Sequence, residues 1–296
     1  MADPASLLSS RQMAEFAARG FLRFDGAVPD SINRRFCEEA RENDVPEVAA
    51  GTPLEAAYAP GSTLRELVEL PLVRGAIESL VGPGSRFDHH FLHIAHVPET
   101  FEKLGLRQSS QPIHQDSTID PGPGFDTQLF YFPHEVTREM GGTRLLPGSH
   151  LRIVSEAAVS RYQNLRGQQH VVCPAGSLLV AHHGLWHGGG RNRSDRPRYM
   201  FKIRLNPTVP QQRLWNTDDL GPEAAAQRPI FWLREAQDPE HLHSILCRLE
   251  PWYEQDTGRL EILNRIRFWR FLLGDPHFDA DYWLSRLENR TGSVGS

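Results

Sequence analysis

The period of the hydrophobic pattern changes near residue 86, and this change limits the folds that the chain can adopt. In RFDHHFLHIAHV, residues 86–97, the side chains fall into two alternating sets, which is typical of a β-strand. Short apolar segments separated by turns follow, and strands are expected at 126–133, 143–148, 169–174, 177–183 and 198–207. Because no long helices intervene, the pattern favours a sandwich or barrel over a parallel α/β sheet.

Helical periodicity precedes this β-rich stretch. Ser9 and Gln12 have the spacing of a capping box, and residues 30–43 carry apolar side chains one helical turn apart. A further helix is expected at 62–82, divided at Pro71 because proline cannot donate the helical hydrogen bond. The N-terminal flank, about 1–85, is therefore predicted to be helical.

Helical periodicity returns after about residue 211. Helices are expected at 223–236 and 259–275, and the apolar face at 259–273 is the first candidate surface for a homo-oligomer. No linker composition, repeat or low-complexity run divides the chain. The fold class is therefore predicted as mainly β with flanking α-helices. The domain boundaries expected are a single domain at 1–290, with a β core at about 86–208, a helical flank at about 209–290 and a disordered tail at 291–296.

Composition excludes several classes of partner. The net charge is -5, from 32 basic and 37 acidic residues, so the chain has no electrostatic reason to bind nucleic acid or an anionic membrane. Cys37, Cys173 and Cys247 are few, far apart and odd in number, which fits a reducing compartment. The first ten residues, MADPASLLSS, have no leader pattern, and no run of about 18 apolar residues occurs. We therefore expect a cytoplasmic protein.

Two histidines and an aspartate form a candidate metal site. In QPIHQDSTID, residues 111–120, His114 and Asp116 are two positions apart, so on a strand both point to one face while Gln115 points away. His187 ends a strand-like segment directly before three glycines and offers a third ligand. Two histidines and one carboxylate on one side of an ion suit non-heme Fe(II), and with a water they also suit Zn(II).

A second triplet, His277-Phe278-Asp279, has the same His-x-Asp pattern. Such a triplet is expected by chance about once in a chain with 14 histidines. No third histidine and no arginine follow it, and Asp279 precedes a helical segment, so a helix cap is the better interpretation. His182 and His183, just before the third candidate ligand, are interpreted as packing residues.

Arg198 follows His187 by eleven residues, at the start of the next expected strand. An iron oxygenase of this kind needs a two-electron reductant, and a dicarboxylic keto acid needs a buried guanidinium to hold its distal carboxylate. The turn Gly188-Gly189-Gly190 reverses the chain, so Arg198 can return beside the histidine. This spacing favours the oxygenase interpretation, because a zinc hydrolase leaves Arg198 without a function.

Three motifs carry a likeness to a known family. They are Gln111-x-x-His114-x-Asp116, Gly141-Gly142-Thr143-Arg144-Leu145-Leu146-Pro147-Gly148-Ser149-His150 and His187-Gly-Gly-Gly-x-Asn192-x-Ser194-x-x-x-Arg198. Together they resemble the phytanoyl-CoA dioxygenase family of Fe(II)/2-oxoglutarate-dependent oxygenases. The resemblance covers about 87–207 and is weaker in the N-terminal helices.

This resemblance implies a double-stranded β-helix core (jelly-roll, cupin-like) in an enzyme that uses Fe(II), 2-oxoglutarate and O2. The residues implied for the site are His114, Asp116 and His187 as iron ligands, Arg198 for the co-substrate carboxylate, and Gln111 and Thr143 as further contacts of 2-oxoglutarate. Many relatives have serine or threonine two residues after the distal histidine, where this chain has Gly189. That departure makes Thr143 the expected source of the missing hydrogen bond.

The intact Asp116 indicates oxygenation, because relatives that halogenate carbon have glycine or alanine there. The resemblance thus implies a dioxygenase that hydroxylates, or otherwise oxidises, an unactivated C–H bond of a small molecule, with release of succinate and CO2. The segment 99–110 holds only Lys103 and Arg107, which favours a free small molecule, such as a secondary metabolite, over an acyl-CoA. Two alternatives stay open: a zinc hydrolase with the same ligands and a non-catalytic ligand-binding barrel.

Overall fold

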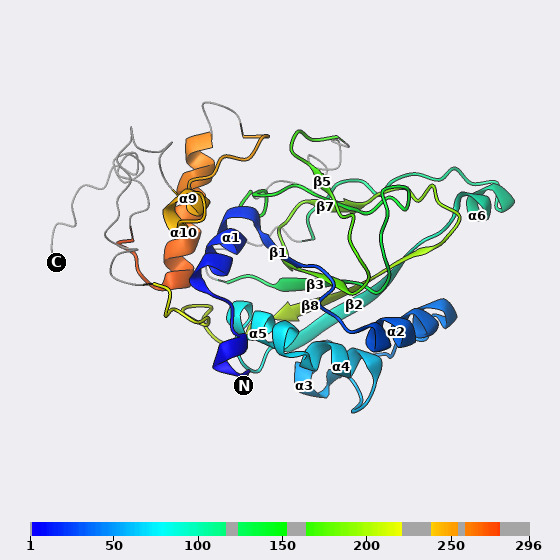
Figure 1. Cartoon of the computed structure of the whole chain (residues 1–296), viewed down its shortest axis with the longest axis horizontal. Helices are drawn as coiled ribbons and strands as arrows, with labels where there is room; N and C mark the ends of the chain where they lie inside the picture. Colours follow the sequence, from blue (N-terminus) through cyan, green and yellow to red (C-terminus); the bar gives the residue numbers. More distant parts are fainter. Residues whose placement is uncertain (1, 117–123, 153–163, 221–237, 254–257, 279–296) are drawn as a thin grey trace.

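Two antiparallel β-sheets lie at the centre of the molecule (Figure 1). The computed structural model describes residues 2–116, 124–152, 164–220, 238–253 and 258–278, with the backbone alone at 258 and 259. The larger sheet has the order β1-β6-β3-β8-β2, formed by β1 (Phe21–Phe24), β6 (Ser177–His182), β3 (Thr127–Phe132), β8 (Arg198–Asn206) and β2 (Arg86–Ala95). The smaller has the order β5-β4-β7, formed by β5 (Gln169–His170), β4 (Thr143–Leu145) and β7 (His187–Gly189).

The strands form a two-layer arrangement. In Figure 1, β5 and β7 lie above β3, β8 and β2. The chain passes from β5 in the smaller sheet to β6 in the larger, back to β7 and again to β8. The strand predicted at 143–148 is therefore only three residues long, and the one predicted at 169–174 only two, because each belongs to the short sheet.

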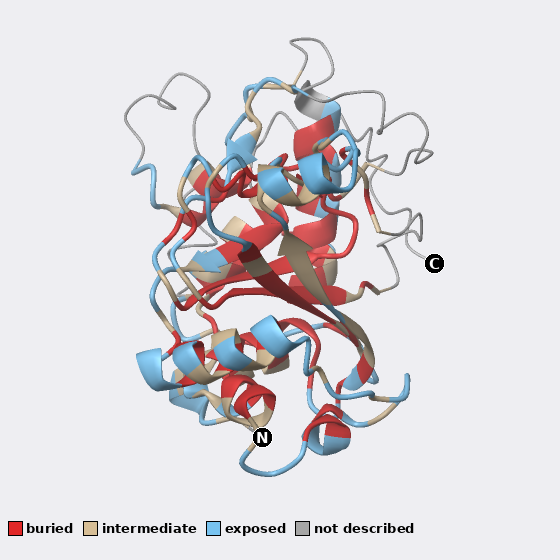
Figure 2. Ribbon diagram, turned by 90° about the vertical axis from the view of Figure 1, so that its right-hand side faces the viewer, coloured by how far each residue is buried: buried red, intermediate tan, exposed pale blue. Residues whose placement is uncertain are grey.

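The central strands β6 and β3 of the larger sheet, and most of β8, are buried on both faces, and Figure 2 shows a red core between layers. Successive side chains of a strand point to opposite faces. Phe130 and Met200 accordingly pack in a cluster with Leu145 of the smaller sheet, while Leu129 and Phe201 pack in a second cluster with the helices. Burial on both faces explains why the polar and apolar residues of these strands do not alternate cleanly.

The outer face of the larger sheet is covered by N-terminal helices (Figure 1). These are α2 (Asp30–Glu42), α3 (Leu54–Ala57), α4 (Thr63–Glu69) and α5 (Pro71–Leu80). Two elements precede them in the chain, a short 3-10 turn, η1 (Pro4–Ser6), and α1 (Ser10–Arg19). The predicted capping box is present at the start of α1, where Ser9 and Gln12 exchange side-chain and backbone hydrogen bonds. Pro71 divides α4 from α5 as expected.

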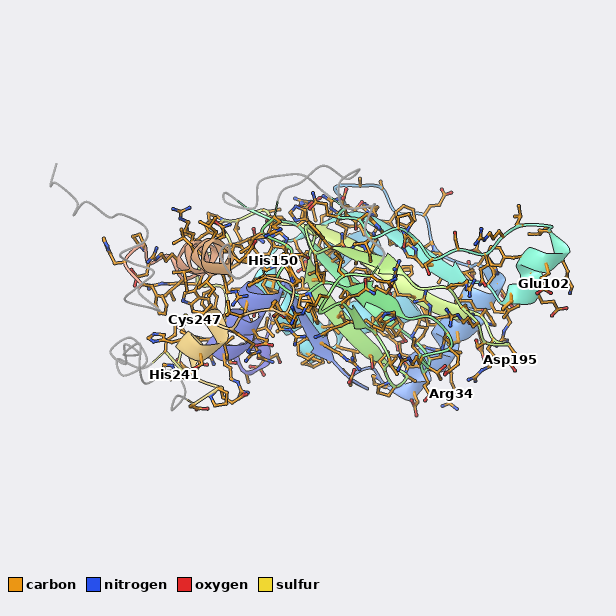
Figure 3. All side chains as sticks on the ribbon, turned by 90° about the horizontal axis from the view of Figure 1, so that it is seen from above. Arg34, Glu102, His150, Asp195, His241 and Cys247 are labelled. Carbon is orange, nitrogen blue, oxygen red and sulfur yellow. The ribbon has the colours of Figure 1, made fainter. Side chains whose placement is uncertain are left out.

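One short helix within the β core was not predicted. It is α6 (Pro98–Lys103), which has proline at its first position and an ion pair between Glu99 and Lys103. Figure 3 shows Glu102 of this helix at the opposite end of the molecule from His241. The connection from β2 to the candidate metal ligands therefore passes through a helix at the far end of the sheet.

The C-terminal helices pack against α1. They are α9 (Leu242–Leu246) and α10 (Gly258–Leu273), whereas the helix predicted at 223–236 and the tail at 291–296 lie outside the described residues. Most apolar side chains of α10 are buried within the chain, among them Ile262, Ile266, Trp269 and Leu272, whereas Leu260 is exposed. Most of this face is therefore covered within the chain, and self-association through α10 stays a prediction. Among the described residues, no helix has the length and apolar character needed to cross a membrane.

Candidate metal centre

The backbone places the first two candidate ligands opposite the third. His114 lies outside the regular strands, yet it forms an isolated bridge with His187 of β7, with N–O distances of 2.9 and 2.8 Å. This bridge aligns His114 and Asp116 on one face, as their spacing predicted. Gln115 points the other way, and its Oε1 accepts a hydrogen bond from Nε1 of Trp186 at 3.2 Å.

Glycine allows the two segments to approach closely. A Cβ atom added at Gly188 would stand 2.7 Å from the carbonyl oxygen of Pro112, closer than side chains normally come. Any other residue at Gly188 would therefore push β7 away from the segment that carries His114. The glycine after His187 thus has a structural function in bringing the candidate ligands together.

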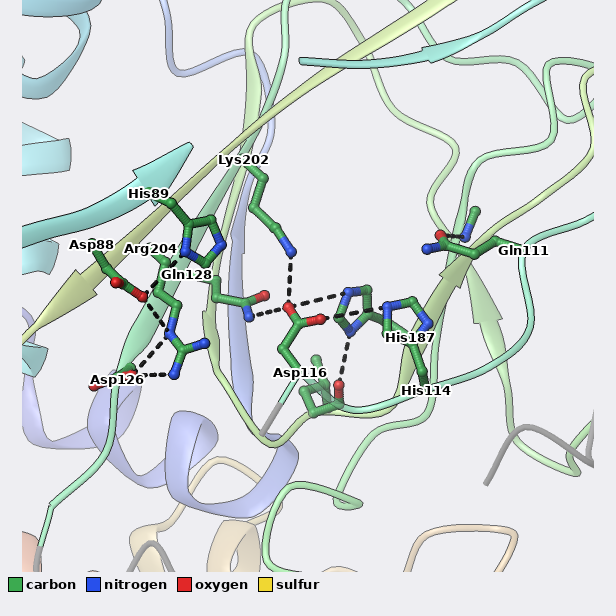
Figure 4. Close-up of polar contacts among 12 residues, drawn as sticks. Asp88, His89, Gln111, His114, Asp116, Asp126, Gln128, His187, Lys202 and Arg204 are labelled. Atoms are coloured by element: carbon green, nitrogen blue, oxygen red, sulfur yellow. Dashed lines mark hydrogen bonds and ion pairs between the residues drawn. The ribbon is translucent and has the colours of Figure 1, made fainter. Parts of the chain in front are cut away.

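The three side chains converge on one point (Figure 4). One ligand atom from each of His114, Asp116 and His187 lies within 4.8 Å of the other two. Nε2 of His114 is 3.5 Å from Oδ1 of Asp116, and Nε2 of His187 is 3.8 Å from Oδ2. Within the part of the chain that the structure describes, this is the only group of three or more such residues that close together.

Hydrogen bonds orient both imidazole rings. Nδ1 of His114 donates to the carbonyl of Pro112 at 2.9 Å, and Nδ1 of His187 donates to that of Leu185 at 2.9 Å. With the proton on Nδ1, each ring presents the lone pair of Nε2 toward Asp116, as metal-binding histidines do. Burial lowers the pKa of His187 to about 4, so this ring stays neutral and able to bind a metal at neutral pH.

Asp116 contacts two residues that the sequence analysis did not identify. Its Oδ2 accepts hydrogen bonds from Nζ of Lys202 at 2.8 Å and from Nε2 of Gln128. Burial alone would raise the pKa of Asp116, but the ammonium of Lys202 and its hydrogen bond are among the contacts that outweigh burial and hold that pKa well below its usual value. The carboxylate is therefore ionised at neutral pH.

Arg198 lies buried in the same cavity, 4% exposed. Its Nη1 donates to Oγ1 of Thr143 over a long 3.5 Å, and its Nε has no hydrogen-bond partner among the described residues. None of the described carboxylates forms an ion pair with it. Burial lowers the pKa of Arg198 to about 10, which still leaves the guanidinium charged. A buried cation without an anion is a site where an anionic ligand can bind.

Gly189 and Gln111 border this guanidinium. Oε1 of Gln111 accepts a hydrogen bond from the backbone N–H of Gly189 at 2.9 Å, so the side-chain NH2 of Gln111 remains as its donor group and has no acceptor among the described residues. A Cβ atom at Gly189 would lie 3.6 Å from Nη2 of Arg198. The missing side chain therefore leaves room beside Arg198, and Thr143, directly opposite Gly189 in the sheet, has a hydroxyl that accepts a hydrogen bond from Arg198.

A cavity of about 400 Å³ joins these groups. Phe91 and His93 of β2 and Met200 and Lys202 of β8 line it beside the candidate ligands. Burial lowers the pKa of His93 to about 4, so His93 contributes a neutral ring. A space of this size suits a small molecule together with a short keto acid.

The remaining residues named in the sequence analysis contribute to packing or to backbone hydrogen bonding. Trp186 is buried, and Asn192 uses its side chain to bind the backbone of Ala95 and Arg196 in the loop. Of the second His-x-Asp triplet, Asp279 lies outside the described residues. His182 is buried and stacks on Phe125, away from the candidate ligands.

The buried histidines predict acid sensitivity. The ring centroids of His150, labelled in Figure 3, and His182 are 5.1 Å apart, and both rings pack against Phe268 of α10. Burial lowers the pKa of His150 to about 3 and the pKa of His182 well below 6.5. In the unfolded chain these rings take up protons below pH 6.5, whereas in the folded chain they do not. Stability should therefore be full above pH 6.5 and fall as the pH drops toward the folded-state pKa, by about 2 kcal/mol per histidine at pH 5.

Urea unfolding of the metal-free protein at pH 7.5 and pH 5 measures this loss. His150→Gln should reduce the loss by about 2 kcal/mol, because it removes one of the titrating rings. An identical pH dependence in the variant and the wild type would show that His150 does not cause it.

Comparison with known proteins agrees with this geometry. The sequence profile described as Phytanoyl-CoA dioxygenase (PhyH) matches residues 73–200, a range that contains all three candidate ligands and Arg198. Over these residues, less than half of the chain, the sequence is similar to the phytanoyl-CoA dioxygenase family. The suspected resemblance is thereby confirmed.

Curated relatives of this chain match over shorter stretches. The uncharacterized protein Mb1539 of Mycobacterium bovis is 31% identical over 124 residues, 42% of this chain and 43% of that protein. Dioxygenase andF of Emericella variicolor is 29% identical over 108 residues, 34% of this chain and 36% of that protein. The match therefore spans less than half the length of each relative.

A solved structure shares the fold. The non-heme alpha ketoglutarate dependent epimerase SnoN from nogalamycin biosynthesis is 20% identical and superposes with a TM-score of 0.52. The superposition covers 70% of this chain and 85% of that chain. The antiparallel sheets of this chain are therefore arranged as in that protein.

Proposed function

We propose that the chain is an Fe(II)/2-oxoglutarate-dependent dioxygenase that hydroxylates, or otherwise oxidises, an unactivated C–H bond of a small molecule, releasing succinate and CO2. The observation that carries this proposal is the buried, unpaired guanidinium of Arg198 beside three converging metal ligands. The two sheets, between which the chain alternates from β5 to β8, would be the double-stranded β-helix of such enzymes.

The donor set fits iron. Nε2 of His114, Nε2 of His187 and a carboxylate oxygen of Asp116 are two nitrogen ligands and one oxygen ligand, the set used by non-heme Fe(II) oxygenases. When bound together, Fe(II) and 2-oxoglutarate supply the O2-dependent oxidation. The protein itself would contribute the placement of the reacting groups and the exclusion of water.

Arg198, Thr143 and Gln111 would bind the co-substrate. The guanidinium can pair with the distal carboxylate through two parallel hydrogen bonds, which only arginine can offer. Because Oγ1 of Thr143 accepts from Arg198, its own proton is free to be donated to the same carboxylate. Gln111 has a free NH2 group on the other side of Gly189.

The substrate would bind at the mouth of the cavity. Phe91, 55% exposed, lies there together with His93 and Phe101. Apolar and neutral aromatic groups at this place favour an uncharged or weakly polar small molecule, such as a secondary metabolite. Few basic residues occur between 99 and 110, so a CoA ester has little to bind its phosphates.

Anaerobic addition of Fe(II) and then 2-oxoglutarate to the metal-free protein tests the proposal. We expect the weak visible charge-transfer band of a chelated keto acid, its loss in His114→Ala, and succinate after O2 is admitted. Tight zinc binding without such a band would favour the zinc hydrolase instead. Binding of neither metal would favour a ligand-binding barrel.

A further inference from the structure

The two carboxylate oxygens of Asp116 have different surroundings (Figure 4). Oδ2 accepts a hydrogen bond from Nζ of Lys202 at 2.8 Å and a second from Nε2 of Gln128. Each oxygen also faces a candidate ligand, Oδ1 at 3.5 Å from Nε2 of His114 and Oδ2 at 3.8 Å from Nε2 of His187, and each of these nitrogens presents a lone pair because the ring proton is on Nδ1. Both lone pairs of Oδ2 are therefore engaged, whereas Oδ1 is left to bind a metal.

The larger sheet holds both donors in place. In the pairing of β3 with β8, Gln128 lies opposite Arg204 and Phe130 opposite Lys202, so Gln128 and Lys202 are on the same face. The side chain of Lys202 is 8% exposed and Gln128 is 1% exposed. A buried ammonium is unfavourable without an anionic partner, so the ion pair with Asp116 keeps Lys202 at this point.

We propose that Lys202 and Gln128 are positioning residues whose hydrogen bonds occupy Oδ2 of Asp116, so that the carboxylate binds the metal through Oδ1 alone. The inference rests on the proposed function, because it concerns the iron centre. Two histidines and one carboxylate oxygen leave three positions on a six-coordinate ion, two for the keto acid and one for O2. A carboxylate bound through both oxygens would occupy the position that O2 needs.

Manganese is a suitable probe, because coordinated water on Mn(II) accelerates the relaxation of solvent water protons. With Mn(II) and 2-oxoglutarate bound, the wild-type protein should keep one exchangeable water. In the double variant Lys202→Met/Gln128→Leu, Asp116 can bind through both oxygens, so the relaxation enhancement should fall at least about twofold. Lys202→Arg keeps a cation and hydrogen-bond donors, and it should retain most of the enhancement.

Arg204→Met is the matched control. Arg204 lies two residues further along β8 and forms its own ion pair with Asp126, with Nε 2.8 Å from Oδ2 and a side chain that is 14% exposed. Arg204 does not line the cavity. The control variant therefore loses a comparable ion pair, yet we expect its Mn(II) binding and water relaxation to equal those of the wild type.

Turnover of the iron-loaded protein gives a second readout. The double variant should form succinate about 10- to 100-fold more slowly at saturating 2-oxoglutarate. The half-saturating concentration of 2-oxoglutarate should change less than about twofold, because Arg198 is intact. A rise in that concentration without a change in water relaxation would show that Lys202 acts in co-substrate binding, and it would overturn the proposal.

Two further outcomes would overturn it. The first is a double variant that binds Mn(II) and 2-oxoglutarate with wild-type water relaxation. The second is a double variant that folds, as judged by circular dichroism, but binds no Mn(II). The two donors would then be needed for Asp116 to bind a metal at all, and not only to keep Oδ2 off the metal. If the wild-type protein itself binds neither Mn(II) nor 2-oxoglutarate, the proposed function fails, and the wild-type titration separates this failure from the other two.

Discussion

Asp116→Ala is expected to abolish the oxidation of 2-oxoglutarate by the iron-loaded protein, lowering succinate formation at least about a thousandfold, or about 4 kcal/mol. The variant removes one of three converging ligands, so the remaining two histidines bind Fe(II) weakly. Anaerobic Fe(II) titration and succinate measurement after admission of O2 test both effects. Wild-type Fe(II) affinity in this variant would exclude Asp116 as a ligand.

The same variant should also weaken the fold. Without Asp116, the buried Lys202 loses its ion-pair partner, which typically costs about 3–5 kcal/mol. Asp116→Asn keeps a carbonyl oxygen for Lys202, so it should lose turnover with a smaller loss of stability. Asp126→Asn is the matched control, because this carboxylate pairs with Arg204 outside the cavity and should leave turnover within about twofold.

Arg198→Ala is expected to raise the half-saturating concentration of 2-oxoglutarate about 100-fold while leaving Fe(II) affinity unchanged. The guanidinium would make two charge-assisted hydrogen bonds to the distal carboxylate, and losing them costs about 2–3 kcal/mol. Succinate formation as a function of 2-oxoglutarate concentration measures the effect. An unchanged requirement for 2-oxoglutarate would disprove the function given to Arg198.

Arg198→Lys separates charge from geometry. Lysine keeps the positive charge but cannot form two parallel hydrogen bonds, so we expect an intermediate rise of about tenfold. Arg191→Ala provides the control, since Arg191 is an exposed arginine lining the same cavity. Because Arg198 has no described carboxylate partner in the protein, its loss should not destabilise the metal-free fold as Asp116→Ala does.

The candidate ligands could be predicted from the sequence because their relation is largely local. His114 and Asp116 are two residues apart, and Arg198 opens the strand that follows His187. In extended backbone this spacing alone puts side chains on one face. His114 lies outside any regular strand, so its direct bridge to His187 of β7 could be seen only in the folded backbone.

Lys202 and Gln128 could not be predicted in the same way. Lys202 is four residues from Arg198 and therefore on the same face of β8, which is the one signal that the sequence carries. Its contact with Asp116 depends on how β8 packs against the segment that carries Asp116, which is 86 residues away from Lys202 in the chain. Gln128 joins them only through the register of β3 with β8.

The sequence by itself determined the antiparallel strands, the helical flanks, the division at Pro71 and the spacing of the candidate site, because each follows from a local pattern. It left open what covers the apolar side of α10, most of which packs inside the chain. Only the tertiary structure showed the packing of α10 and the different hydrogen bonding of the two oxygens of Asp116. Both depend on contacts between segments far apart in the chain, and strand register and helix packing set such contacts.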